Sequence, residues 1–411
     1  AGPVLVVAPT SVVGVWAEQA AKFTPGLRVR CVSETASRRG TTIQEEAEAS
    51  DIVVTSYTLA RLEADQWREA ALSGVVIDEA QAVKNPRTAT YRALRDMNAP
   101  WRLAVSGTPI ENSLGDLWSL LSLTCPGLLP PWDAFTQKVR RPIEGGDPDM
   151  LARLTSYVAP FILRRTKEEV ATDLPDKIVD VVRVDLGKEH RHIYDQYLAR
   201  ERARILDLLA EPDANRMSVL ASITRLRQLA LDPALVGREE YAHVGSAKVE
   251  YVADRLDEIV PLGHRALIFS QFTSFLARIR VVLERRGVSV VQLDGSTRNR
   301  EEVVERFRSG EAQVFLISLK AGGSGLTLTE ADYVYVMDPW WNPAAEEQAI
   351  DRAHRIGQTK KVNVYRLVAT DTIEAKVVEL QDRKRRLISS VMNGTGTGAS
   401  LSVADLRGLL D

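Results

Sequence analysis

The chain has 411 residues, of which 45% are hydrophobic and 26% charged, so it is long enough for two or three domains with well-filled cores. Its net charge of -2 excludes a global basic field, so a nucleic-acid surface would have to be a local patch. Two cysteines and five histidines give neither a disulfide framework nor a zinc spacing. Because no apolar run approaches ~20 residues and no signal-peptide pattern opens the chain, we expect a cytoplasmic protein without a membrane span.

The first part of the chain alternates short apolar runs with helical patterns. The apolar runs predict strands at 4–8, 28–32, 51–56, 74–78 and 102–105. Helical spacing follows the first run and stops at Pro25-Gly26, and a second helix is expected at 87–97. Strands that alternate with helices predict an α/β fold with a doubly wound parallel sheet.

The middle of the chain, from about Leu117 to Val244, is poorer in strand patterns. Long helices are expected at 189–210 and 216–231. The run Arg164-Arg165-Thr166-Lys167 is a local positive cluster, which is either a solvated helix end or a phosphate contact.

A second alternating series follows. Strands are expected at 266–269, 288–293, 313–317, 333–337 and 362–367. Helices are expected at 247–259, 272–286, 298–308 and 344–354. We therefore predict two α/β lobes at 1–122 and 245–370, a helical connection at 123–244, and a bracing helix with a tail at 371–411.

Two adjacent carboxylates, Asp78 and Glu79, end the buried run that starts at Gly74. The carboxyl end of a parallel strand faces the crevice where such sheets bind ligands. In nucleotide hydrolases an Asp at this place holds magnesium, and a neighbouring Glu orients water. The alternative is ordinary solvated surface charge.

A glycine-rich loop, Gly322-Gly323-Ser324-Gly325, follows the strand at 313–317. It fits neither the Walker A pattern nor Gly-x-Gly-x-x-Gly, so a dinucleotide-binding dehydrogenase is not indicated. Three interpretations stay open: a close-packed turn, a phosphate cradle, or a backbone contact to nucleic acid.

Three polar residues, Gln348, Arg352 and Arg355, recur at spacings of four and three. If the helix continues through them, one face carries all three. Bidentate arginine donors on one face suit a departing γ-phosphate, and the alternative is surface charge.

Several segments together resemble the motor of the SWI/SNF-type ATPases in helicase superfamily two. The resemblance extends from Val4 to about Leu387 and is most specific in the run from Trp340-Trp341-Asn342-Pro343 to Arg355-Ile356-Gly357-Gln358. Further matching motifs are Val-Leu-Val-Val-Ala-Pro-Thr-Ser, Asp-Glu-Ala-Gln, Ser-Gly-Thr-Pro-Ile-Glu-Asn, Ala-Leu-Ile-Phe-Ser-Gln-Phe and Arg-Leu-Arg-Gln-Leu-Ala-Leu-Asp-Pro. The resemblance implies two RecA-like lobes with helical insertions, the first lobe being incomplete at its N-terminus.

The resemblance also implies roles for individual residues, with ATP and magnesium as cofactors. Asp78 would hold magnesium, Glu79 would be the general base, and Gln81 would link nucleotide state to the neighbouring lobe. The implied nucleotide contacts are Asp78, Glu79, Gly325, Arg352 and Arg355, with Gln348 helping to close the cleft. Coupling is implied for Ser106, Gly107 and Thr108, and contacts to a duplex backbone for Pro9, Thr10, Ser296, Ser318 and Gly322.

The chain departs from the family pattern in one respect, because it lacks the Walker A sequence Gly-x-Gly-Lys-Thr, which would precede the first strand. Its lysine and backbone N–H groups are the main ligands of the β- and γ-phosphates. We therefore expect the chain to be part of a longer protein and not to hydrolyse ATP by itself.

The function expected from these features is ATP-dependent translocation on double-stranded DNA, with remodelling or displacement of DNA-bound protein. RNA polymerase is one such target, because the composition and the Asp-Glu-Ala-Gln form look bacterial; nucleoid association would follow. Two alternatives stay open: an unwinding helicase on RNA or single strands, and a clamp or polymerase-docking module without turnover.

Overall fold

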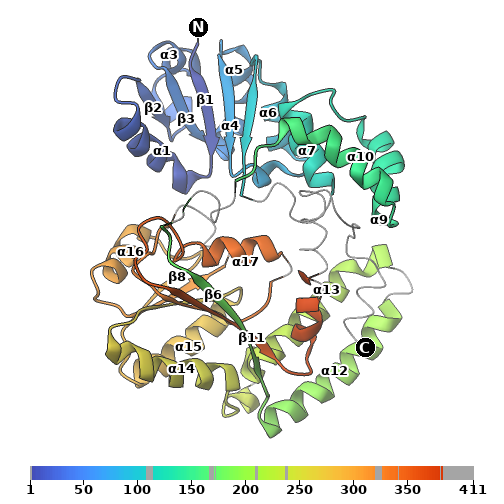
Figure 1. Ribbon diagram of the computed structural model, residues 1–411, viewed down its shortest axis with the longest axis vertical. Helices are drawn as coiled ribbons and strands as arrows, with labels where there is room; N and C mark the ends of the chain where they lie inside the picture. The colour runs from blue at the N-terminus through green and yellow to red at the C-terminus, as the bar shows by residue number, and fades with distance from the viewer. Residues whose placement is uncertain are drawn as a thin grey trace. The chain divides into compact units, whose positions relative to one another are not determined.

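The computed structural model describes residues 2–107, 114–165, 171, 173–208, 212–236, 239–319, 326–340, 342–379 and 381–382, without the side chains of 205–208, 212–217, 239 and 344. The chain divides into two compact units, which in the described residues cover 2–163 and 164–382 (Figure 1). Each unit has its own sheet and its own hydrophobic cores.

The sheet of unit 1 has the order β2-β3-β1-β4-β5, and all its pairings are parallel. Its strands are β1 (Val4–Ala8), β2 (Val29–Val32), β3 (Ile52–Ser56), β4 (Gly74–Asp78) and β5 (Arg102–Val105). β1, β3 and β4 are fully or partly buried apolar runs, as expected of strands covered on both faces, whereas the edge strands β2 and β5 are half exposed. The first residue of β4 is Gly74, and a larger residue would not fit there because its Cβ would overlap the ring of Trp101.

Helices cover both faces of this sheet (Figure 1). One face carries α1 (Thr10–Phe23), whose Val13 packs with Val6 and Val54. The opposite face packs against α3 (Ile43–Glu48), α4 (Tyr57–Leu62), α5 (Ala64–Glu69), η1 (Ala80–Val83) and α6 (Ala89–Asp96), and the short α2 (Ala36–Arg39) precedes α3 without buried residues. Successive residues of β1 point to opposite faces, so this one strand contributes to both cores.

A helical subdomain completes unit 1 with a separate core around Leu117, Phe135 and Leu154. Its elements are α7 (Leu114–Thr124), α8 (Trp132–Phe135), the π-helix η2 (Thr136–Arg140), α9 (Arg141–Glu144), α10 (Pro148–Val158) and η3 (Ala159–Phe161).

The sheet of unit 2 has the order β6-β11-β10-β7-β9-β8 and is also entirely parallel. Its strands are β6 (Lys177–Val184), β7 (Ala266–Ser270), β8 (Val290–Leu293), β9 (Val314–Ser318), β10 (Tyr333–Val336) and β11 (Val362–Ala369). The two lobes with parallel sheets are thus confirmed. The edge strand β6 lies in the stretch that we expected to be mainly helical, and no strand was predicted at its position.

Helices of unit 2 pack on both faces of its sheet. They are α14 (Ala247–Ile259) and α15 (Thr273–Arg285) on one side, and α16 (Arg300–Arg308) and α17 (Pro343–Ile350) on the other. A further core joins α12 (Lys188–Leu208) and α13 (Pro212–Leu231) to the helical residues 373–379. Short 3-10 turns are η4 (Pro233–Val236), η5 (Glu239–Tyr241) and η6 (Val260–Leu262).

None of the helices in the described part of the chain has the length and apolar character that a membrane span requires. Residues 383–411, which include much of the expected bracing helix and its tail, lie outside the described residues.

Candidate functional site

The two acids lie at the topological switch point of the unit 1 sheet. The chain leaves β1 toward β2 on one side and leaves β4 toward β5 on the other, so the switch point, where sheets of this kind bind ligands, lies at the carboxyl ends of β1 and β4. Asp78 is the last residue of β4, and Pro9 directly follows β1. Asp78 and Pro9, which are expected to contact nucleotide and DNA respectively, therefore lie at the same edge of this sheet.

Glu79 has a left-handed backbone, with φ of 51°. Its N–H donates to Asp78 Oδ1 at 2.9 Å, and its carbonyl accepts from the Tyr57 hydroxyl at 3.3 Å. A non-glycine residue in this region costs about 1–2 kcal/mol, and such conformations concentrate at functional sites. The turn therefore separates the two neighbouring carboxylates and fixes their directions.

A hydrogen-bonded chain links the acid to the next strand. Gln81 Nε2 donates to Glu79 Oε2 at 2.5 Å, and Ser106 Oγ donates to Gln81 Oε1 at 2.8 Å. Ser106 directly follows β5, so the end of β5 is linked to the Glu79 carboxylate through the side chain of Gln81. Gly107 is exposed next to Ser106, and Thr108 lies outside the described residues.

Two aromatic residues at this edge were not predicted to belong to the site. Trp16, on α1, donates its indole N–H to Asp78 Oδ2 at 2.7 Å, and the Tyr57 hydroxyl donates to the Asp78 carbonyl at 2.5 Å. Burial, with the neighbouring charges of Asp78 and Glu79, raises the pKa of Tyr57 well above its ordinary value, so it stays a donor. In the sequence, Trp16 is only one of the apolar residues that recur at helical spacing after the first strand.

The acids fit a magnesium ion. Mg²⁺ keeps several waters and usually takes one or two carboxylates together with phosphate oxygens. Asp78, with Glu79 beside it, offers such a donor set, whereas no group of three or more His, Cys, Asp or Glu side chains gathers as a metal cage within the described residues.

The expected DNA contacts are placed differently in the two units. Pro9 is the N-cap of α1 and Thr10 its exposed first residue. In unit 2, exposed Ser296 donates its hydroxyl and N–H to Asp294 Oδ1, which lowers the pKa of Asp294. Ser318 ends β9 and is only 3% exposed. Gly322 and Gly325 lie outside the described residues.

The helix with the expected arginines is shorter than predicted. It ends at Ile350, and the N–H groups of Arg352 and Ala353 donate three residues back, in turns. Gln348 is therefore on the helix, whereas Arg352 and Arg355 follow it. Buried Arg352 donates to the Leu326 carbonyl at 3.2 Å, and exposed Arg355 donates to Thr327 Oγ1 at 3.2 Å.

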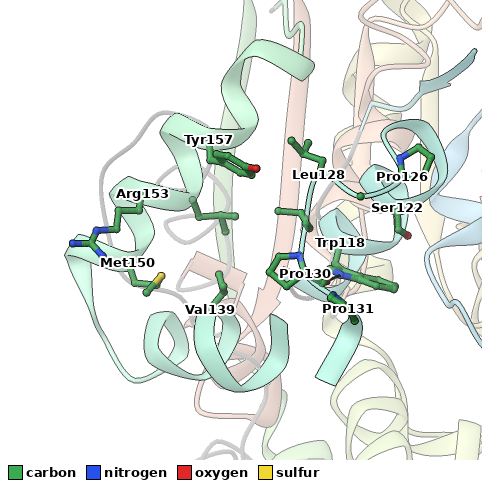
Figure 2. A pocket seen from close by; sticks show the side chains of 13 residues that line it. Trp118, Ser122, Pro126, Leu128, Pro130, Pro131, Val139, Met150, Arg153 and Tyr157 are labelled. Carbon is green, nitrogen blue, oxygen red and sulfur yellow. Dashed lines mark hydrogen bonds between the residues drawn. The ribbon is translucent and has the colours of Figure 1, made fainter. Parts of the chain in front are cut away.

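An apolar pocket of about 740 Å³ lies in the helical subdomain of unit 1. Figure 2 shows Trp118, Leu128 and Pro130 facing Met150 and Tyr157 of α10 across it. None of the predicted site residues lines this pocket.

The structure is that of an α/β protein with two parallel-sheet units, in which two adjacent acids follow β4. Family models match both units: the one described as "SNF2-related domain" covers residues 1–235, and the one described as "Helicase conserved C-terminal domain" covers 248–357. The chain belongs to the SNF2-related family, which confirms the expected SWI/SNF-type membership.

Two curated relatives align with nearly the whole chain. "Putative ATP-dependent helicase/translocase YwqA" of Bacillus subtilis is 33% identical over 99% of this chain and 45% of its own length. "SWI/SNF-related matrix-associated actin-dependent regulator of chromatin subfamily A member 1" of Homo sapiens is 32% identical over 95% of this chain and 39% of its own length. This chain therefore spans less than half of either relative.

A solved structure, the Sulfolobus solfataricus SWI2/SNF2 ATPase core in complex with dsDNA, is also similar. It is 32% identical and covers 99% of this chain and 86% of its own, with a TM-score of 0.45.

Proposed function

We propose that this chain is the motor of an ATP-dependent translocase on double-stranded DNA that remodels or displaces DNA-bound proteins. The observation that carries the proposal is the hydrogen-bonded chain from Ser106 through Gln81 to Glu79, beside Asp78, in a member of the SNF2-related family. The relatives described as a helicase/translocase and as a regulator of chromatin support it.

In the proposed reaction, Glu79 accepts a proton from the attacking water, whose oxygen bonds to the γ-phosphorus of ATP while the bond to ADP breaks. Asp78 would hold magnesium, which offsets the phosphate charge. Arg352 and Arg355 would stabilise the charge that develops on the departing phosphoryl group, and Gln348 would help to close the site.

The Glu79 carboxylate is also the place where hydrolysis would couple to movement. Because Gln81 contacts both Glu79 and Ser106, a change in the protonation or position of Glu79 alters the hydrogen bonds at the end of β5. Ser106, Gly107 and Thr108 would pass this change to the rest of the motor.

DNA contacts would go to the phosphate backbone through Pro9, Thr10, Ser296, Ser318 and Gly322. Such contacts carry no sequence information, so binding should be largely independent of sequence and should weaken with salt. The displaced complex is one that occupies duplex DNA, and RNA polymerase is the candidate in a bacterium.

The test is steady-state ATP hydrolysis by a chain that carries these residues together with a Walker A sequence. We expect strong stimulation by duplex DNA and a loss of at least about a hundredfold in Glu79→Gln, whereas exposed Glu69→Gln serves as the matched control. Residues 1–411 alone contain no Gly-Lys-Thr or Gly-Lys-Ser sequence, so they should show no turnover.

Other outcomes would replace the proposal. Stimulation only by RNA or single strands would favour an unwinding helicase. Absence of turnover under every condition would favour a clamp or a polymerase-docking module.

A further inference from the structure

A buried arginine from the helical part of unit 2 contacts the turn that leads into α17. Arg227, on α13, donates to the Pro339 carbonyl at 2.5 Å and to Gln271 Oε1 at 3.0 Å, and it lies 3.8 Å from Asp338 Oδ2. Ser270 Oγ donates to Asp338 Oδ1 at 2.5 Å, and the Gln271 amide donates to Asp338 Oδ2. Arg227 therefore connects α13 to the ends of both β7 and β10.

Trp340, the next residue of the turn, forms hydrogen bonds with two other side chains, those of Gln381 and Glu346. Gln381 Nε2 donates to the Trp340 carbonyl at 2.5 Å and to Glu346 Oε2 at 2.7 Å. The Trp340 N–H donates to the same carboxylate at 3.3 Å, and Arg366 of β11 donates to Glu346 Oε1 at 2.5 Å. Glu346 lies in the first turn of α17 and is 1% exposed, so these bonds fix the start of that helix.

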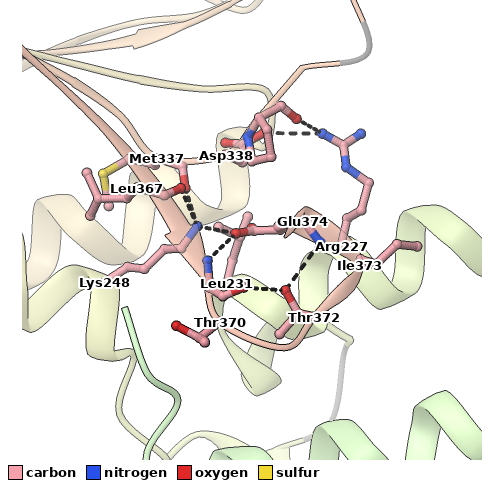
Figure 3. Close-up of polar contacts among 12 residues, drawn as sticks. Arg227, Leu231, Lys248, Met337, Asp338, Leu367, Thr370, Thr372, Ile373 and Glu374 are labelled. Atoms are coloured by element: carbon pink, nitrogen blue, oxygen red, sulfur yellow. Dashed lines mark hydrogen bonds and ion pairs between the residues drawn. The ribbon is translucent and has the colours of Figure 1, made fainter. Parts of the chain in front are cut away.

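A lysine holds the residue before the turn. Lys248 Nζ donates to the carbonyls of Met337 and Leu367 at 2.6 and 3.0 Å and to Glu374 Oε2 at 2.5 Å. Figure 3 shows Lys248 reaching the ends of β10 and β11 while Arg227 approaches Asp338 from α13.

Three carbonyls around the end of β10 thus each accept a hydrogen bond from a buried side chain of a different element. The turn needs such partners because it has left the sheet ladder, and buried carbonyls without a donor are costly. The direction in which α17 starts is consequently set by α13, α14 and the helical residues after β11.

We propose that Arg227 is a positioning residue for the arginines that follow α17. It fixes the turn at residues 338–340 and thereby the positions from which Arg352 and Arg355 would contact the departing phosphoryl group. This inference rests on the proposed function for its effect on turnover. The guanidinium suits the role because its fork donates to two acceptors at once, which a lysine at this place does only in part.

The first test is amide hydrogen exchange on the 411-residue chain. Arg227→Met with Asp338→Asn removes the pair without leaving a buried charge, and Arg227→Lys is the conservative variant. We expect faster exchange at 337–350 in the double variant, an intermediate rate in Arg227→Lys, and no change in β9. The control variant, Arg225→Met with Glu201→Gln, removes a different ion pair, between α13 and α12. The 2.8 Å contact of this pair does not involve the turn.

The second test is hydrolysis in the chain that also carries a Walker A sequence. The double variant should lower kcat by about tenfold or more and leave KM for ATP within about threefold, with Arg227→Lys in between. Exchange that rises equally in β7 and β9, or a kcat within about twofold of the unchanged chain, would overturn the inference. If the unchanged chain shows no turnover, the proposed function fails, whereas the exchange result still decides whether Arg227 fixes the turn.

Discussion

Asp78 has a protein donor on each of its carboxylate oxygens. Trp16 donates to Oδ2 and the Glu79 N–H to Oδ1, so the carboxylate is oriented before any ligand arrives. When a metal ligand loses the group that orients it, metal affinity or activity usually falls. We infer that the indole N–H of Trp16 sets the direction in which Asp78 offers its lone pairs.

Replacing Trp16 by Phe keeps a ring on α1 but removes this N–H. In the chain with a Walker A sequence, we expect the Mg²⁺ concentration for half-maximal hydrolysis to rise by about tenfold, because Asp78 loses its orienting partner. A titration of turnover with Mg²⁺ measures this. The matched control is Trp118→Phe, since that indole donates to the Pro130 carbonyl in the helical subdomain. Equal Mg²⁺ dependence in both variants would contradict the role of Trp16.

At the scale of elements, buried apolar runs made most strands predictable. The runs of β1, β4, β7, β9 and β10 are fully or largely buried, so their sequences carry the signal directly. β6 lacks that signal because it is an edge strand: most of its residues are exposed, and Lys177, Asp180 and Arg183 interrupt the apolar pattern.

Two features of the candidate site depend on contacts that no local pattern encodes. The Leu328 N–H donates to the Arg352 carbonyl at 2.9 Å, and this contact accompanies the change from helix to turns after Ile350. The bond from Trp16 to Asp78 joins residues 62 positions apart. The sequence therefore predicts which acids and arginines are present, whereas the orienting partners require the fold.

The Lys248–Glu374 pair joins α14, the ends of β10 and β11 and the helical residues after β11, so it tests how this end of the sheet is held. Both side chains are at most 1% exposed, and burial raises the pKa of Glu374. Removing Lys248 alone, by Lys248→Met, leaves a buried acid and should lower the free energy of unfolding by about 3–5 kcal/mol. Adding Glu374→Gln should restore most of it, because the amide oxygen still accepts from the Ala369 N–H.

The loss should also depend on pH. A carboxyl whose pKa is raised by folding contributes its full stability at a pH below its pKa in the unfolded chain. That stability is lost as the pH rises toward its pKa in the folded protein. Lys248→Met should therefore lose stability progressively as pH rises above about 4, the ordinary pKa of a glutamate, and the double variant should not. Urea unfolding measures both, with the exposed Lys361–Asp176 pair, at 67% and 78% exposure, as the control site. A loss in Lys248→Met that stays constant with pH would contradict this account.

At the scale of the whole molecule, the net charge of -2 supplies no general attraction to phosphate, so the proposed DNA binding would depend on local backbone contacts. The two units carry separate parts of the expected machinery, with the acids in unit 1 and the arginines in unit 2. Cyclic engagement of such parts would give stepping without strand separation.

Displacement of a triplex-forming third strand measures the proposed translocation on intact duplex DNA directly. With ATP, the chain that also carries a Walker A sequence should release the third strand and leave the underlying duplex paired, whereas Glu79→Gln should release nothing. Separation of the duplex strands, or third-strand release that is the same without ATP, would contradict the account.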